Sequence, residues 1–513
     1  MTQAASASRP FSGAPGAASE KTFFGHPRGL AYLAFTEAWE RFSFYGMSGL
    51  LLLYMIQRLL TPAVMGGVFG LGQFRAALEQ VTGPLGNVAF ASQVYGLYSG
   101  FVYFTPVFGG LLADRVLGQR RTVMLGAVLM SLGHILMAFD GPFLFALLLL
   151  IVGTGCLKGN ISTQVGHLYA PEDESRRTRA FAIFSAAINL GGLLGPLSCG
   201  ILAQAYGWHV GFGVAGLLML LALVTYVSGW KYLPPDRKRS RAGMSGEPRA
   251  PALTGHDWRV IGALLLLTAI AVLPSTAYYQ ETNAGLLFIE GSVRRGLFGL
   301  TVPTPSFNSL DGFFCILVVP PLIWLWKRQN TRGREPGDMG KIAIGYLITA
   351  VANAVTMLPA SWADGGAKVS MGWPVLLYAL NALGFIYYWP TLLALFSRAA
   401  PRAVNATMMG VLFFSTFLGN ILVGTFGGWW ETMSHARFFG FHAVLALVPA
   451  VLMVLLARPL TRLLAPPAPR EDGLRTPPST LDRLDWAARL AAAAGRPAAA
   501  HFGRDAVLQQ RRS

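Results

Sequence analysis

Apolar stretches of about 20 residues recur along almost the whole chain, and they constrain its fold more than any other feature. The hydrocarbon core of a bilayer is about 30 Å thick, so a helix of roughly 20 apolar residues spans it. We count twelve such stretches and predict a membrane-spanning helix for each. The predicted spans are residues 29–56, 90–113, 121–139, 143–166, 179–203, 209–232, 258–283, 307–327, 341–360, 373–398, 405–428 and 437–457.

The composition excludes a water-soluble globule. Charged residues make up 13% of the 513 residues, about half of the roughly 25% usual in soluble domains. A further 53% are hydrophobic before the 59 glycines are counted, which also excludes intrinsic disorder and a collagen-like chain. Cys156, Cys199 and Cys315 fall in apolar runs without a pairing pattern, so we expect buried, unpaired thiols rather than a disulfide scaffold.

The basic residues are distributed unevenly between the loops, and this predicts the topology. With a cytoplasmic N-terminus, 33 of the 41 lysines and arginines lie on the inner side and six in the outer loops, while Arg41 and Lys158 lie within spans. Cytoplasmic loops carry such an excess of positive charge. Both termini are therefore expected in the cytoplasm, and the net charge of +17 requires no nucleic-acid partner. Residues 1–28 lack an apolar core, so we expect no cleavable signal peptide.

A Pro-, Gly- and Arg-rich loop at 233–257 separates six spans from six. This layout is typical of two-lobed transporters with a substrate site between the lobes. We therefore predict an all-α membrane protein of two six-helix bundles, and expect the tail to be mostly disordered, although the pattern after Ser479 fits one helix. The predicted parts are an N-terminal tail (1–28), an N-terminal bundle (29–232), a linker (233–257), a C-terminal bundle (258–457) and a C-terminal tail (458–513).

Span 1 contains three charged residues that a lipid-facing helix would not tolerate. At 100° per residue, Glu37, Glu40 and Arg41 fall on one face of the helix. Each charge costs roughly 2.5–3.5 kcal/mol in a bilayer, so we expect this face to look into the bundle. Lys158 has no acid in its own span, and Glu37 or Glu40 is its expected partner. Such a cluster can bind and release a proton as its pairs form and break. A static salt bridge between two helices is the alternative.

Other polar residues in or near the spans give weaker signals. Asp114 and Arg115 lie at the inner end of span 2, where a contact at the cytoplasmic gate and an ordinary polar helix end are equally favoured. Glu281 and Asp311 either border a central cavity or are solvated at helix ends. His134 is expected to be a satisfied core histidine. Five aromatic residues either line a pocket or simply pack: Tyr98, Tyr103, Tyr387, Tyr388 and Trp389.

The sequence contains no enzyme signature. A Ser/His/Asp arrangement, an HExxH zinc motif and a P-loop are all absent, and the outer loops are too short for a catalytic domain. We therefore expect no catalytic residue, no metal and no cofactor. Without a nucleotide-binding motif, uphill transport would draw on an ion gradient instead of ATP.

Several motifs carry a family resemblance. The run EAWERFSFYG (37–46) is similar to the motif E-x-x-E-R-F-x-Y-Y-G, and ADRVLG (113–118) is similar to a loop between spans 2 and 3. On these motifs the chain resembles the proton-dependent oligopeptide transporter (POT/PTR) family of the major facilitator superfamily, over about residues 29–457. Further matches are GTGCLKGN (153–160), FAIFSAAINLG (181–191), LFGLTVP (297–303), FNSLD (307–311) and, loosely, GFIYYWP (384–390).

The resemblance implies an inner-membrane proton symporter for di- and tripeptides that works by alternating access. It also assigns roles to residues by matched position. These are Glu37 and Glu40 for proton coupling, Arg41 and Lys158 for the substrate carboxylate and for the coupling cluster, and Tyr45 and Asn189 for the lining of the site.

The chain departs from the family pattern where the amino group of a peptide would bind. The family's span-10 glutamate corresponds to Phe385, one helical turn before Trp389. Its span-7 glutamate corresponds to Gln280, which Glu281 follows directly. These four positions complete the set of candidate substrate-binding residues. The carboxylate-binding half of the site is thus kept, while the amine-binding half has lost its acid unless Glu281 or Asp311 substitutes for it.

Together these observations predict a monomeric proton-coupled symporter of the bacterial inner membrane. Its partners would be protons, the lipid bilayer and a small peptide or peptide-like molecule with a carboxylate. A divergent carrier of another organic anion or natural product, working as an importer or exporter, is the first alternative. A membrane receptor or scaffold that retains the fold without transport is the second.

Overall fold

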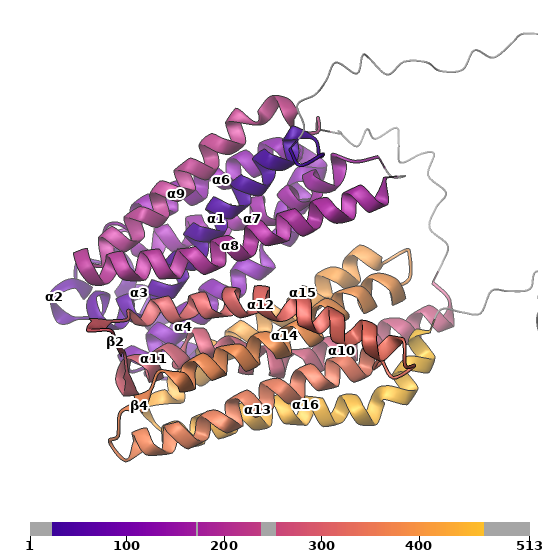
Figure 1. The fold of residues 1–513 in the computed structure, drawn as a ribbon. Coiled ribbons are helices and arrows are strands. Elements are labelled where there is room, and N and C mark those ends of the chain that lie inside the picture. Colours follow the sequence, from indigo (N-terminus) through magenta and orange to yellow (C-terminus); the bar gives the residue numbers. More distant parts are fainter. Residues whose placement is uncertain (1–22, 171–172, 237–252, 466–513) are drawn as a thin grey trace, which may run out of the picture. The chain divides into compact units, whose positions relative to one another are not determined.

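The computed structural model describes residues 23–170, 173–236 and 253–465, which are almost entirely helical (Figure 1). Within these residues, twelve long helices correspond one to one to the predicted spans. They are α1 (Arg28–Tyr54), α4 (Asn87–Phe104), α6 (Gln119–Leu136), α7 (Phe143–His167), α8 (Glu174–Tyr206), α9 (Trp208–Ser228), α10 (Gly255–Tyr279), α12 (Ser309–Asn330), α13 (Asp338–Asp364), α14 (Gly372–Ala399), α15 (Asn405–Gly427) and α16 (His435–Leu464).

Shorter elements extend or connect these helices. α5 and η2 continue α4, and η5 and α11 continue α10. The short helices are η1 (Met55–Leu59), α2 (Pro62–Met65), α3 (Leu71–Thr82), α5 (Pro106–Leu112), η2 (Ala113–Leu117), η3 (Trp230–Tyr232), η5 (Gln280–Thr282), α11 (Ala284–Ser292), η6 (Thr304–Asn308) and η7 (Gly428–Glu431). Two-residue strands form a parallel pair, β1 (Val293–Arg294) with β4 (Val369–Ser370), and a hairpin, β2 (Gly296–Leu297) with β3 (Leu300–Thr301).

Ten helical segments of the described residues are long and apolar enough to cross a membrane. The two predicted spans that fall short are α1 and α6. α1 contains Glu37, Glu40 and Arg41, and α6 begins with Arg120 and Arg121. Charged side chains lower the hydropathy of a helix whether they face lipid or protein. The mean hydropathy of a span that contains charged residues is therefore lower than the hydropathy of its lipid-facing surface.

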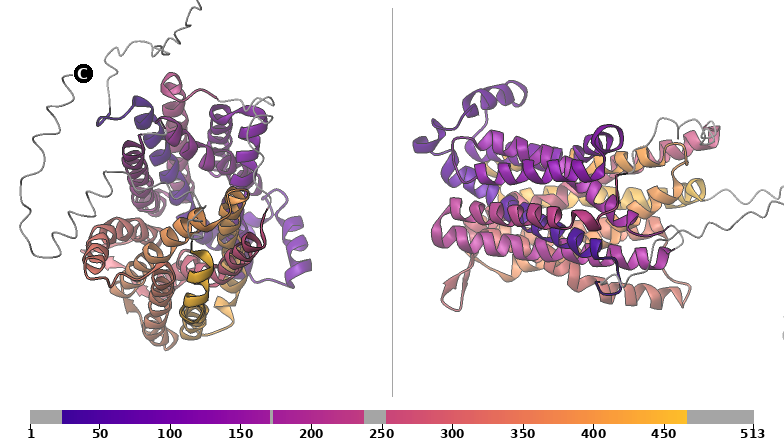
Figure 2. Two further views of the ribbon diagram at one scale, coloured as in Figure 1. Left: turned by 90° about the vertical axis from the view of Figure 1, so that its right-hand side faces the viewer. Right: turned by 90° about the horizontal axis from the view of Figure 1, so that it is seen from above.

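The helices of residues 28–232 pack mainly on one another, as do those of residues 255–464 (Figure 2). The two groups meet along α4–α15 and α8–α12. Gly96 allows the first of these contacts, because a Cβ there would lie 2.6 Å from the carbonyl oxygen of Asn420 on α15. The described residues up to Leu464 form one compact unit. The division into separate bundles at 29–232 and 258–457 therefore stays a prediction.

The ends of the predicted linker are fixed by hydrogen bonds. Asp236 Oδ1 accepts the backbone N–H of Arg120 at 2.8 Å. α10 begins at Gly255, before the predicted residue 258, because Thr254 and Asp257 form a reciprocal capping box with bonds of 3.2 and 2.7 Å. The predicted helix after Ser479 lies outside the described residues.

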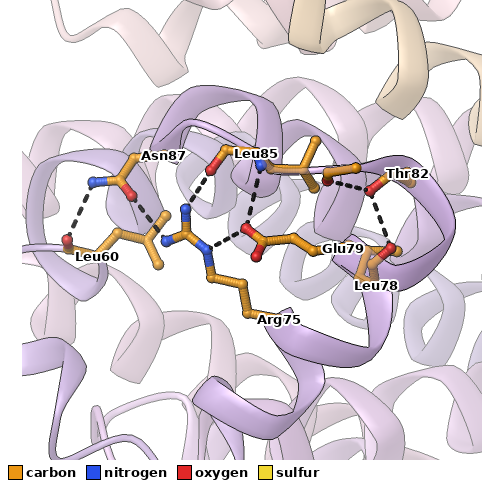
Figure 3. Close-up of polar contacts among 8 residues, drawn as sticks. Leu60, Arg75, Leu78, Glu79, Thr82, Leu85 and Asn87 are labelled. Atoms are coloured by element: carbon orange, nitrogen blue, oxygen red, sulfur yellow. Dashed lines mark hydrogen bonds and ion pairs between the residues drawn. The ribbon is translucent and has the colours of Figure 1, made fainter.

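The segment between α1 and α4 contains an amphipathic helix, α3, that was not predicted. Phe74 and Leu78 of this helix pack on the hydrophobic core. On its other side Arg75 Nε donates to Glu79 Oε1 at 2.9 Å and Arg75 Nη1 to Asn87 at 3.2 Å, while Arg75 also bonds the carbonyl of Leu85 (Figure 3). The signal was present as two pairs at i,i+4 spacing, one apolar and one charged.

Candidate functional site

The three charged residues of α1 are enclosed by protein. Glu37, Glu40 and Arg41 are 3%, 0% and 2% exposed. The guanidinium of Arg41 makes a bidentate contact with Glu40, in which Nη2 lies 2.5 Å from Oε1 and Nε donates to Oε2. Its Nε also lies 3.4 Å from Oε1 of Glu37. Arg41 therefore holds both acids, and its charge is directed mainly to Glu40.

Lys158 of α7 does not form the direct ion pair that the sequence predicts. In the described part of the chain no carboxylate oxygen lies within 4.0 Å of its Nζ. The ammonium instead lies 4.1 Å from the centroid of the Tyr103 ring, a cation–π geometry. Glu37 and Glu40 are close enough to act on Lys158 electrostatically. Arg41, the next residue along α1, already occupies both oxygens of Glu40, while Oε2 of Glu37 has no hydrogen-bond partner among the described residues.

A cavity of about 300 Å³ lies between helices of both halves of the chain. Its walls come from α1, α4 and α8 on one side and from α10, η5, η6, α12, α14 and α15 on the other. The first wall contains Phe44, Tyr45, Ser48, Gly49, Tyr95, Ser99, Tyr103, Ile188 and Asn189. The second contains Tyr278, Tyr279, Glu281, Thr282, Asn308, Asp311, Cys315, Phe385, Trp389 and Asn420.

The predicted substrate-binding residues divide into three groups by their position. Five of the eight line the cavity, namely Tyr45, Asn189, Glu281, Phe385 and Trp389. Arg41 and Lys158 do not line it but contact rings that do, with the Arg41 guanidinium 5.9 Å from the Tyr45 ring. Gln280 is turned away, because its side-chain amide contacts His442 Nε2 at 3.2 Å and the Val423 carbonyl at 3.5 Å. Each of the two cations is therefore separated from the cavity by an aromatic ring that lines it, and Gln280 lies outside the site.

Glu281 and Asp311 both lie at the cavity, on neighbouring elements. Glu281, 4% exposed, accepts a hydrogen bond from Asn381 Nδ2 at 2.9 Å through Oε2. Asp311 accepts one from the hydroxyl of Tyr278 at 2.8 Å through Oδ1. Among the described residues neither acid has an ion-pair partner within 4.0 Å. Of the two roles that the sequence left open for these acids, the structure supports the cavity position.

Phe385 is part of a stack of aromatic rings in the second wall. Its ring lies 5.0 Å from that of Tyr278 and 6.2 Å from that of Trp389, with an interplanar angle of 18° in both pairs. The α14 position that carries an acid in the resembling family thus presents an aromatic face here. No acidic residue of α14 lines the described cavity.

One stripe of cavity residues on α4 was only partly predicted. Tyr95, Ser99 and Tyr103 are spaced four residues apart and all line the cavity. The i,i+4 periodicity of hydroxyl-bearing residues was the available signal. Of the other aromatic candidates, Tyr98 packs near Phe44, Tyr387 on Trp326 and Tyr388 on Tyr346.

His134 and the pair Asp114 and Arg115 are the remaining candidates. His134 is fully buried, but neither ring nitrogen has a hydrogen-bond partner among the described residues, so the prediction of a satisfied histidine is wrong. Asp114 and Arg115 lie in the π-helical turn η2 and are exposed, without an ion pair to a described residue. Their role at a gate stays a prediction.

The chain is similar to proteins of known class over most of its length. A sequence model described as the POT family matches residues 120–242 and 252–435. The chain is 32% identical to the peptide transporter YePEPT of Yersinia enterocolitica, covering 80% of this chain and 89% of that protein. It is 28% identical to a di-/tripeptide transporter of Lactococcus lactis, covering 87% of this chain and 98% of that protein.

Solved structures give the same result for the fold. The crystal structure of a peptide transporter POT mutant in complex with alafosfalin matches with a TM-score of 0.74 and 27% identity, over 87% of this chain and 98% of that one. The twelve-helix fold predicted from the sequence is confirmed by this likeness.

Proposed function

The chain belongs to the POT family, and on this premise we propose that it is a proton-coupled symporter of di- and tripeptides or related molecules with a carboxylate. The substrate would cross a bacterial inner membrane by alternating access of the cavity to the two sides. We place both termini in the cytoplasm and expect a monomer. The proton gradient would supply the energy, without a bound cofactor.

One observation carries the proposal: cations lie behind one wall of the cavity, and carboxylates line the other. Behind the rings of Tyr45 and Tyr103 on the first wall lie two cations, Arg41 and Lys158. The second wall carries the carboxylates of Glu281 and Asp311. A free peptide has a carboxylate at one end and an ammonium group at the other, so its charges complement the two walls.

The α1 cluster supplies a route for coupling to protons. Glu40 holds the guanidinium of Arg41 in a bidentate contact. Protonation of Glu40 would remove the negative charge that holds Arg41, and the guanidinium would become available to a substrate carboxylate. Lys158, which has no direct acid partner within 4.0 Å among the described residues, would be the second cation for that carboxylate. In this proposal Glu37 keeps Arg41 near the site when Glu40 is neutral.

Two features also favour the first alternative, a carrier for another organic anion. Phe385 removes the acid that the family places on α14, and the cations of the first wall would bind many carboxylates. Anion uptake without peptide uptake would support this alternative. A receptor or scaffold would show no uptake across a broad panel in spite of intact folding.

Uptake by purified protein in proteoliposomes tests the proposal. We expect an inward proton gradient to accumulate a labelled dipeptide, and we expect a protonophore to abolish this accumulation. Glu79→Gln, in helix α3, which contributes no residue to the cavity lining, serves as a matched acid-to-amide control and should transport normally. Accumulation that is independent of the gradient would contradict proton coupling.

A further inference from the structure

We propose that Glu281 and Asp311 form a subsite for a cationic amino group of the substrate, and that this subsite replaces an acid on α14. The inference rests on the proposed transport function and names the part of the cavity that discriminates between substrates. Both residues line the cavity, Glu281 from η5 at the end of α10 and Asp311 from the first turn of α12.

The hydrogen bonds to the two acids leave one oxygen of each without a donor. Asn381 donates to Oε2 of Glu281, and Tyr278 donates to Oδ1 of Asp311. Within the described residues no donor reaches Oε1 of Glu281 or Oδ2 of Asp311. Glu281 is 4% exposed and lines the cavity, so its carboxylate is removed from bulk water. Each acid is thus held in place by a protein donor and keeps one acceptor for a ligand.

The charge balance of the site points to a cation. In the α1 cluster, two acids are matched by Arg41 and Lys158. Glu281 and Asp311 line the same cavity, and no described cation lies within 4.0 Å of either. A buried carboxylate such as Glu281 beside a half-buried one such as Asp311 needs a compensating positive charge or a proton. An ammonium group that enters the cavity would supply this charge and three hydrogen-bond donors.

The aromatic stack defines what lies beside that ammonium group. Tyr278 donates to Asp311 and stacks at 5.0 Å on Phe385, which in turn stacks on Trp389. Aromatic faces attract cations and apolar side chains alike. The subsite therefore favours a primary amine next to an aromatic or large apolar side chain, as at the amino-terminal residue of a peptide such as phenylalanyl-alanine.

Binding to the purified full-length protein tests the subsite without requiring transport. We would measure the affinity for phenylalanyl-alanine and for its N-acetylated form, which differ in the charge of the amino group. For the wild-type protein we expect N-acetylation to weaken binding at least tenfold. For the double variant Glu281→Gln/Asp311→Asn we expect this ratio to fall to nearly one. Glu79→Gln should retain the wild-type ratio.

The outcomes separate the subsite from the transport proposal. A wild-type ratio near one, or a double variant with an unchanged ratio, would overturn the subsite even if driven peptide uptake were normal. A large ratio that the double variant abolishes would support the subsite even if no gradient-driven uptake occurred, which would overturn the symporter alone. If the double variant does not fold, the single variants Glu281→Gln and Asp311→Asn decide, because each keeps an acceptor for Asn381 or Tyr278.

Discussion

The two charged regions beside the cavity differ in the groups that neutralise their acids. The α1 cluster is internally balanced, since Arg41 contacts Glu37 and Glu40 directly and Lys158 lies within electrostatic reach of both acids. The acids of the second wall, Glu281 and Asp311, have hydrogen-bond donors but no cation within 4.0 Å among the described residues. The first region holds equal numbers of acids and cations, while the second contributes acids alone to the cavity lining.

This difference in charge balance fits different roles for the two regions in the proposed transport cycle. A balanced cluster can change its pairing when a proton binds, because the loss of one negative charge releases a cation. An acid pair without a cation remains incomplete until a ligand or a proton neutralises it. We therefore assign coupling to the first region and substrate discrimination to the second. The same kind of substitution should then have different effects in the two regions.

The largest effect is expected from Glu40→Gln. Arg41 would lose the carboxylate that holds it, and breaking one partner of a buried ion pair costs about 3–5 kcal/mol. We expect a lower Tm in detergent and no gradient-driven uptake. Counterflow exchange, which needs no proton gradient, should persist. Driven uptake at the wild-type rate per folded protein would contradict the coupling role of Glu40.

Glu40→Asp is the control for this variant. It keeps the charge, so the guanidinium of Arg41 retains an ionic partner, although the shorter side chain changes the geometry. We expect driven uptake to be reduced but measurable. Equal loss in Glu40→Asp and Glu40→Gln would indicate that geometry alone, and not the titratable charge, is required.

Lys158→Ala should have the next largest effect. The loss of a charge-assisted contact to a substrate carboxylate costs about 1.5–3 kcal/mol, which is roughly 10- to 150-fold in affinity. We expect this loss for a dipeptide and a much smaller one for its C-terminal amide, measured by binding to purified protein. The Glu281→Gln variant should show the reverse pattern, with a large loss for the free dipeptide and a much smaller one for its N-acetylated form. Equal losses for the free acid and the amide would contradict the role of Lys158.

The sequence predicts the α1 site better than the second wall, for physical reasons. A charge within an apolar span is rare and costly, so Glu37, Glu40, Arg41 and Lys158 are conspicuous by position alone. The absence of a direct pair at Lys158 could not be predicted, because competition from Arg41 depends on side-chain reach within the folded bundle. The sequence gives no distance between helices, and the partner of a buried cation is decided by distance.

The second wall is harder to predict because its acids lie at helix ends. Asp311 lies in the first turn of α12 and Glu281 in the turn after α10, where an acid is normally solvated. Which of Gln280 and Glu281 faces the cavity depends on the 3-10 geometry of η5, and an error of one residue exchanges them. Most helix ends were predicted to within about five residues, because the length of an apolar stretch depends on local composition. α16 continues to Leu464, beyond the predicted end at 457.

Phe385→Leu separates the aromatic stack from the acids beside it. A stacked aromatic pair contributes about 0.5–1.5 kcal/mol beyond its buried area, so we expect phenylalanyl-alanine to bind about 2- to 10-fold more weakly. The ratio between the free and N-acetylated peptide should stay the same, because Glu281 and Asp311 are unchanged. A change of that ratio would show that the ring of Phe385 itself takes part in amine recognition.

The smallest effect is expected from Glu79→Gln, which removes a paired acid that is outside the cavity (Figure 3). Hydrogen bonds from Arg75 and from the backbone of Leu85 hold the pKa of Glu79 below its ordinary value of 4.5. Because the folded-state pKa is the lower one, this stabilisation is present above the ordinary pKa and is lost as the pH falls through the folded-state pKa. The variant should therefore melt slightly below the wild type at pH 7 and together with it at low pH, while uptake is unchanged. A transport defect in Glu79→Gln would mean that α3 takes part in the transport cycle, as a third region beside the α1 cluster and the acids of the second wall.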